Sequence, residues 1–244
     1  MITSSEQIER ELHSLSDPAQ VAHLARFFKT GPGDYGEGDL FLGIRVPVTR
    51  SVVRTYSKGA DYDDVRRLTA SPHHELRLAG FLLLVDLYSR ARRRRDSVEM
   101  RHAVDLYLSL IERGNNWDLV DVIAPKILGD WLVSYPEERH LLDSLADMHG
   151  SLWHQRVAIV STWTIIRAGE YDDTLRLAEK LVSHSHDLMH KATGWMLREV
   201  AKRGGEERIT PFLDRHARTM PRTMLRYAIE RFPEPLRLHY LNLK

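Results

Sequence analysis

Apolar residues recur along most of the chain at the spacing of an α-helix. Segment 74–88 places apolar side chains at positions i, i+3, i+4 and i+7, which form one stripe on a helix: Leu78, Phe81, Leu82 and Val85. Segment 152–168 has the same kind of spacing at Ile159, Trp163 and Ile166. Strand-like patterns are limited to segment 40–44 and to Val52 and Val53. The pattern therefore predicts an all-α fold.

Turn-forming residues mark where several of these helices begin. Asp17 followed by Pro18 is typical of an N-cap residue and the first helical position, where the missing amide hydrogen of proline costs nothing. Similar starts are predicted at Val46-Pro47 and Ser71-Pro72. The glycine-rich segment 31–39 (GPGDYGEGD) is predicted to be a connecting loop. It is not a phosphate-binding loop, because no strand precedes it and no Gly-Lys-Ser/Thr follows it.

Five segments share a common register, centred on Arg77, Asp118, Arg156, Lys191 and Arg226, and they are 41, 38, 35 and 35 residues apart. A drifting period of this length with two helices per unit is typical of HEAT or armadillo repeats. We therefore predict an all-α HEAT-like repeat solenoid, forming one domain over residues 1–244. Antiparallel helix pairs would stack so that equivalent positions line up along one concave face.

Composition excludes some classes of protein and leaves others open. Of 244 residues, 43% are hydrophobic and 28% are charged, which is ordinary for a globular protein, and the absence of cysteine excludes disulfides and thiolate metal sites. The polar N-terminal segment does not resemble a secretory signal, and no apolar run could span a membrane. We therefore expect a cytoplasmic monomer without a membrane partner. The net charge of +1 means that any DNA contact must come from cations sorted onto one face.

Four residues fall in phase with the repeat. Trp117 and Asp121 are four residues apart and so share one face of a helix, Arg156 follows 35 residues later, and Trp195 lies 39 residues beyond it. A carboxylate can stabilise an oxocarbenium-like sugar and place a water, indole rings can hold a cationic base, and a guanidinium can grip a phosphate. An alkylated purine that is already cationic needs little else in order to leave its sugar. The set therefore fits cleavage of such a base from DNA.

The motifs around these residues resemble those of the AlkD-like DNA alkylation repair family. They are ARFFK at 25–29, FLGIRVP at 41–47, NWDLVD at 116–121, LGD at 128–130, WHQRVAIV at 153–160 and KATGWMLREVAK at 191–202. The resemblance implies a HEAT-like glycosylase that removes N3- and N7-alkylated purines from double-stranded DNA without a metal or cofactor, and without the full base flipping of pocket-forming enzymes. It also implies that Asp121 is the catalytic carboxylate, that Trp117 and Trp195 line the cleft, and that Arg156 grips phosphate. Phe27 stands where relatives often have tyrosine, so it keeps the aromatic face and lacks the hydroxyl.

Further DNA contacts are expected from a basic strip. Lys191, Arg198 and Lys202 follow one another at spacings of 7 and 4 residues on one predicted helix. We add Arg45 and Phe27 as DNA-binding candidates. The run of arginines at 92–95 is predicted to be a solvated turn at a repeat corner.

Plainer interpretations exist for several of these residues. The basic strip of Lys191, Arg198 and Lys202 could equally be a solvated helix face. Asp121 and Arg156 could form a rung of the Asp–Arg ladder that often links HEAT repeats, and Trp195 could be a core residue. Trp131, Trp153 and Trp163 are assigned to packing. The histidines His184, His186 and His190 do not place a set of metal ligands on one helical face, so no metal site is expected. At the level of function, a DNA-binding module without chemistry and a protein-binding scaffold are the alternatives.

Overall fold

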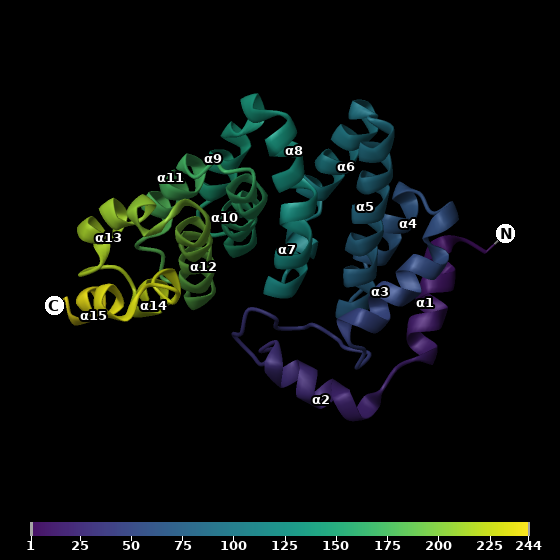
Figure 1. Ribbon diagram of the computed structural model, residues 1–244. Helices are drawn as coiled ribbons and strands as arrows, with labels where there is room; N and C mark the ends of the chain where they lie inside the picture. Colours follow the sequence, from purple (N-terminus) through teal and green to yellow (C-terminus); the bar gives the residue numbers. More distant parts are fainter. Residues whose placement is uncertain (1, 244) are drawn as a thin grey trace. The chain divides into compact units, whose positions relative to one another are not determined.

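The computed structural model describes residues 2–243, and helices account for its regular structure (Figure 1). The first helices are α1 (Ser4–Ser14), α2 (Pro18–Phe27), α3 (Val46–Tyr56), α4 (Tyr62–Thr69), α5 (His74–Arg94), α6 (Ser97–Ser109), α7 (Trp117–Ile123) and α8 (Leu128–Ser134). They are followed by α9 (His140–Ala146), α10 (Leu152–Arg167), α11 (Asp172–Leu181), α12 (Asp187–Gly204), α13 (Thr210–His216), α14 (Arg222–Ala228) and α15 (Glu234–Asn242). Within residues 2–243 the strand-like pairing is one isolated bridge, between Leu40 and His73. The all-α prediction is confirmed.

The chain divides into two compact units, Met1–Leu119 and Val120–Lys244, and the division falls inside α7. Trp117 therefore belongs to the first unit and Asp121 to the second, although one helix carries both. The expectation of one domain over residues 1–244 remains a prediction.

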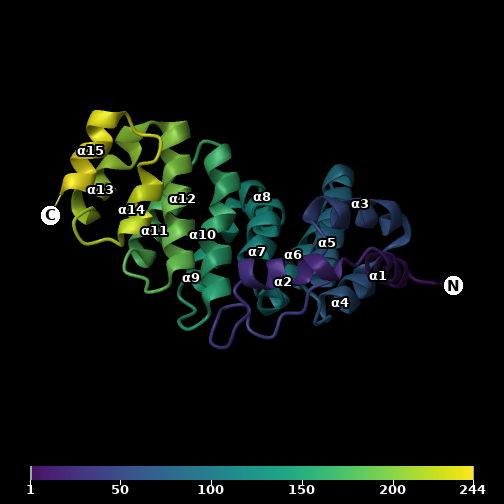
Figure 2. The same cartoon turned by 90° about the horizontal axis from the view of Figure 1, so that it is seen from below.

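Helices pack in the succession expected of HEAT-like repeats. In the first unit α5 packs against α3, α4 and α6. In the second unit α10 packs against α8, α9 and α12, and α12 packs in turn against α11 and α14; Figure 2 shows α10, α12 and α14 side by side. The five segments identified by their common register lie on α5, α7, α10, α12 and α14. The repeat predicted from the sequence is therefore confirmed as a succession of stacked helices.

Helix starts follow the local sequence closely. Asp17 is the N-cap of α2, where its side chain accepts a hydrogen bond from the amide of Ala19 (3.0 Å), and Pro18 is the first helical residue. Pro47 lies in the first turn of α3, one position later than predicted, because Arg45 is the N-cap. The start predicted at Ser71-Pro72 is wrong, because α5 begins at His74 with His73 as its N-cap. The strand-like reading of Val52 and Val53 is wrong, because both are buried residues of α3.

Segment 40–44 is irregular because a buried carboxylate binds its amide groups. Glu75 is 2% exposed and accepts hydrogen bonds from the amides of Leu42 (2.9 Å), Gly43 (3.0 Å) and Ile44 (3.1 Å). Gly43 has a φ of 85°, and a Cβ there would lie 2.1 Å from the carbonyl oxygen of Asp17. These amides are therefore satisfied without a neighbouring strand, which fixes the path of the chain between α2 and α3.

Two glycines let helices of the second unit approach closely. A Cβ at Gly129 would lie 2.4 Å from the carbonyl oxygen of Ser161, so α8 and α10 touch through their backbones. A Cβ at Gly194 would lie 2.5 Å from the carbonyl oxygen of Met224, at the contact between α12 and α14. Since Trp195 follows Gly194 on α12, this contact also fixes the backbone of Trp195 relative to α14.

Candidate functional site

Asp121 and Arg156 form a fork-shaped ion pair in the second unit. The Nε and one terminal nitrogen of Arg156 donate to the two carboxylate oxygens of Asp121, at 2.9 and 2.8 Å. The other terminal nitrogen of Arg156 donates to the carbonyl oxygen of Leu188 at 2.5 Å. Arg156 therefore connects the second half of α7 to the first turn of α12.

The two partners of this pair differ in their access to solvent. The side chain of Arg156 is 5% exposed, whereas that of Asp121 is 18% exposed. The ladder rung considered as the plainer interpretation is present, and it leaves the carboxylate partly open to water. The phosphate-gripping role expected for Arg156 stays a prediction, since each nitrogen of this guanidinium already donates within the protein.

The stripe of α12 that carries Trp195 is its more exposed side. Lys191, Trp195 and Arg198 are partly exposed and Lys202 is exposed, whereas the residues between them are mostly buried. Trp195 is therefore a residue at the edge of the core, between two cations of the basic strip. Lys191 forms an ion pair with Asp187 (2.7 Å), and Arg198 forms one with Glu230.

Phe27 and Trp117 lie together in the first unit. Their ring centroids are 5.8 Å apart in an edge-on arrangement, and the ring of the buried Phe28 lies 5.0 Å from Phe27 and 5.6 Å from Trp117. The side chain of Phe27 is 56% exposed, so its ring is open to solvent beside Trp117. The sequence named Phe27 and Trp117 as separate candidates, and the structure brings them into contact.

A buried polar cluster, which the sequence did not reveal, lies beneath these rings. The Nε2 of His74 lies 2.9 Å from an oxygen of Asp118, and its Nδ1 lies 3.4 Å from an oxygen of Asp39. Arg77 (2.7 Å) and Asn115 (3.0 Å) also donate to Asp39. Two signals are present in the sequence: Asp118 directly follows Trp117, and Arg77 and Asp118 are two of the residues on which the common register is centred.

The charges in this cluster shift the pKa values of its members. Burial disfavours the charged imidazole, but the charge of Asp118 and hydrogen bonds to Asp118 and Asp39 outweigh it and raise the pKa of His74 to about 9. Burial also opposes the ionised form of Asp39, yet the hydrogen bond with His74 and the charge of Arg77 lower the pKa of this carboxyl. His74 is therefore an imidazolium at neutral pH.

The remaining candidates lie at the surface or in the core. Arg45 is exposed and precedes α3, and the arginines at 92–95 are exposed at the end of α5, as predicted. Trp131 (3% exposed) and Trp153 (7% exposed) are core residues. Trp163 is only partly buried, and the guanidinium of Arg167 lies 4.7 Å from the centre of its ring.

The three histidines near the start of α12 make structural hydrogen bonds. His184 bonds to the side-chain oxygen of Gln155 (2.9 Å), His186 caps α12 by accepting from the amide of Leu188 (3.1 Å), and His190 bonds to the carbonyl of His184 (2.5 Å). Among residues 2–243, no group of three or more His, Asp or Glu side chains could hold a metal ion. The same residues include no helix that is both long enough and apolar enough to cross a bilayer.

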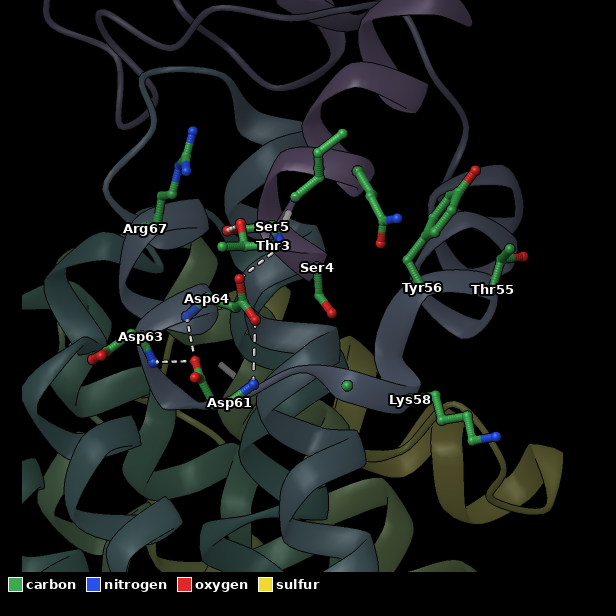
Figure 3. Close-up of a pocket in the computed structure, with 13 residues that line it drawn as sticks. Thr3, Ser4, Ser5, Thr55, Tyr56, Lys58, Asp61, Asp63, Asp64 and Arg67 are labelled. Carbon is green, nitrogen blue, oxygen red and sulfur yellow. Dashed lines mark hydrogen bonds between the residues drawn. The ribbon is translucent and has the colours of Figure 1, made fainter.

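A pocket near the N-terminus is lined by hydroxyl and charged groups (Figure 3). Its acids already serve local structure: Asp61 caps α4, and Asp64 accepts hydrogen bonds from the amides of Ser5 (2.8 Å) and Asp61 (3.2 Å). Arg67 pairs with Glu6 (2.9 Å). The pocket therefore joins α1 to α4, and it contains none of the residues singled out above.

Stacked helix pairs with a partly exposed carboxylate, held by a buried guanidinium, define a HEAT-like helical-repeat protein. A family model described as DNA alkylation repair enzyme matches residues 8–232, so the chain belongs to the DNA alkylation repair enzyme family. A solved structure described as a predicted DNA alkylation repair enzyme from Enterococcus faecalis has a TM-score of 0.67 at 16% identity, covering 90% of this chain and 97% of that chain. At this identity the likeness establishes the fold alone. No curated protein sequence matches the chain.

Family membership confirms the resemblance derived from the motifs. It identifies the protein as an enzyme of DNA repair, with DNA as its substrate.

Proposed function

We propose that this protein is a DNA glycosylase that hydrolyses the bond between the sugar and an N3- or N7-alkylated purine in double-stranded DNA. The observation that supports this most directly concerns the Asp121 carboxylate. Arg156 binds both of its oxygens, and the side chain is still 18% exposed to solvent. An anion that is fixed in place and reachable by water is what this hydrolysis requires from the protein.

The reaction divides into bond breaking and water addition. The bond between C1′ and the base nitrogen breaks, and its electron pair neutralises the cationic base as it leaves. Asp121 stabilises the positive charge that develops on the sugar. A water then forms the new bond to C1′ and loses a proton, which the same carboxylate can accept before passing it to solvent.

Arg156 prepares Asp121 for this role. A fork-shaped guanidinium binds one lone-pair direction on each carboxylate oxygen, which sets the orientation of the Asp121 carboxylate. Because Arg156 also donates to the carbonyl of Leu188, the guanidinium that orients the carboxylate is itself held by α12. The proposed enzyme therefore meets the substrate with its anion already oriented.

Aromatic and basic residues supply binding. Trp117 and Trp195 would line the cleft against the cationic base and the sugar, and Phe27 would add an exposed aromatic face. Lys191, Arg198, Lys202 and Arg45 would contact phosphates. Since Lys191 and Arg198 are paired with exposed carboxylates in the free protein, binding would exchange Asp187 and Glu230 for phosphate oxygens.

The proposed reaction uses only side chains and water, and we expect the protein to act as a cytoplasmic monomer. The test is to incubate the purified protein with a duplex that carries one N7-methylguanine, and to measure the released base and the abasic site. Release over the spontaneous rate is expected. Absence of release would contradict the proposal.

A DNA-binding module without chemistry is the second candidate. The observation in its favour is that a purely structural Asp–Arg rung would form the same hydrogen bonds as Asp121 and Arg156. Salt-dependent binding of duplex DNA without any base release would support this candidate.

A further inference from the structure

His74 makes contacts that a neutral histidine could not satisfy. Both ring nitrogens face carboxylates, Asp118 at 2.9 Å and Asp39 at 3.4 Å, and the side chain is 3% exposed. A neutral imidazole has one donor and one acceptor, so only the doubly protonated ring can donate to both acids. The ring therefore acts as a charged bridge between the loop that ends at Asp39 and the first turn of α7.

We propose that His74 is a positioning residue that fixes Trp117 at the start of α7. This inference rests on the proposed function only in so far as Trp117 contacts the lesion. His74 lies beneath the aromatic rings and would not touch DNA, so it is not a catalytic residue. The geometry connects it to Trp117 by two routes.

The first route runs through the backbone. One oxygen of Asp118 accepts from His74, and the other accepts from the amide of Leu119 at 2.9 Å. Asp118 directly follows Trp117, so the bridge fixes the peptide that carries the indole. Asn115, two residues before Trp117, is held in the same way by Asp39 (3.0 Å) and Arg77 (2.9 Å).

The second route runs through stacked rings. The imidazole lies 4.8 Å from the ring of Phe28 and 4.9 Å from that of Phe41, and Phe28 lies 5.6 Å from the indole of Trp117. A cationic ring is attracted to both aromatic faces. Losing the charge would therefore loosen the packing beneath Trp117 as well as the bond to Asp118.

The groups that face His74 balance in charge only when the ring is protonated. Asp39 from the loop and Asp118 from α7 carry two negative charges, and Arg77 carries one positive charge. The nearby carboxylate of Glu75 is occupied by three backbone amides, and Arg113 lies next to Arg77. Deprotonation would leave an excess negative charge in a site from which water is largely excluded, which favours rearrangement at the start of α7.

The test uses protein labelled with 5-fluorotryptophan, in which the resonance of Trp117 is assigned from the Trp117→Phe variant. We expect His74→Gln to shift or broaden the Trp117 resonance and to leave those of Trp131, Trp153, Trp163 and Trp195 in place. His73→Gln is the matched control, because His73 is the neighbouring histidine and its ring packs edge-on against His13, with centroids 5.3 Å apart. His74→Phe keeps the ring stack and loses both hydrogen bonds, so it separates the two routes.

The Trp117 resonance of the wild-type protein should also titrate with His74, and this titration should be absent in His74→Gln. In single-turnover base release, we expect His74→Gln to slow the reaction about tenfold while DNA affinity stays within about twofold. The reason is that a misplaced Trp117 would hold the substrate in a less reactive position. An unchanged Trp117 resonance in His74→Gln, or an equal change in His73→Gln, would overturn the inference. The resonance reports on position even if the wild-type protein releases no base, so failure of the proposed function would be recognised separately.

Discussion

Arg156 holds both carboxylate oxygens of Asp121 and, with its remaining nitrogen, the carbonyl of Leu188. One guanidinium thus connects the second half of α7 to α12 and orients the acid on which the proposed chemistry depends. Structural and catalytic roles are not exclusive here, because a fixed anion serves both.

Arg156→Lys should keep the positive charge and lose the fork. A lysine donates from one point, so it cannot hold both oxygens of Asp121 and the carbonyl of Leu188. We expect base release to slow by about tenfold or more. The free energy of unfolding should fall by about 1–3 kcal/mol, because some buried hydrogen bonds of Arg156 would no longer form. Single-turnover kinetics and urea denaturation measure the two effects.

Arg139→Lys is the matched control, because Arg139 makes a comparable fork with Glu170 (2.6 and 2.8 Å) in the same unit, away from the proposed site. Equal loss of base release in both variants would show that Arg156 acts through general stability alone.

Gly194→Ala should displace α12. The added Cβ would lie 2.5 Å from the carbonyl oxygen of Met224, so α12 and α14 must separate and Trp195 must move with its helix. We expect a loss of about 1–3 kcal/mol in the free energy of unfolding, together with slower base release. Gly59→Ala is the control, since its Cβ would meet only the side chain of Ser4, at 4.0 Å. A Gly194→Ala protein as stable as Gly59→Ala would contradict the close contact of these helices.

Stability should depend on His74 over a defined pH range. The pKa of His74 is raised from 6.5 to about 9, so its stabilising contribution is fully present below pH 6.5 and is lost as the pH rises through 9. The difference in urea midpoint between the wild-type protein and His74→Gln should be largest near pH 6 and should shrink by pH 10. A difference that is constant from pH 6 to pH 10 would refute the charged bridge.

Phe27 should matter for activity and little for folding. Its ring is 56% exposed, so Phe27→Ala removes little buried area and should change the free energy of unfolding by less than about 1 kcal/mol. We expect weaker binding of lesion-containing duplex, because the exposed face beside Trp117 is lost. Phe27→Tyr should keep this affinity, and thermal melting together with fluorescence-anisotropy titration distinguishes the cases. Unchanged binding by Phe27→Ala would exclude the ring from the DNA contact.

The sequence predicts this fold well where local chemistry decides it. Asp17 with Pro18 marks the start of α2, and the common register of the five segments marks one helix in each repeat. The boundary between the two units could not be predicted, because it falls inside α7, a continuous helix with no linker composition.

The candidate site could be predicted only in part from the sequence, because the repeat period reveals only those contacts that follow it. The pairing of Asp121 with Arg156 follows from a separation of one repeat, so the periodicity reveals it. The bridge from His74 to Asp39 spans an irregular loop whose path depends on the amide bonds to Glu75 and on the φ of Gly43. No periodic pattern encodes such a path, and so this cluster could not be found from the sequence.

The catalytic role of Asp121 is tested by single-turnover release of N7-methylguanine from duplex DNA with the wild-type protein, Asp121→Asn and Asp173→Asn. Asp173 is the matched acid, since it is 14% exposed and paired with Arg139 in the same unit. Asp121→Asn should lose base release by about 100-fold or more, the scale of a lost transition-state charge, and should still bind DNA, while Asp173→Asn should keep the wild-type rate. Undiminished release by Asp121→Asn would show that this carboxylate is not catalytic.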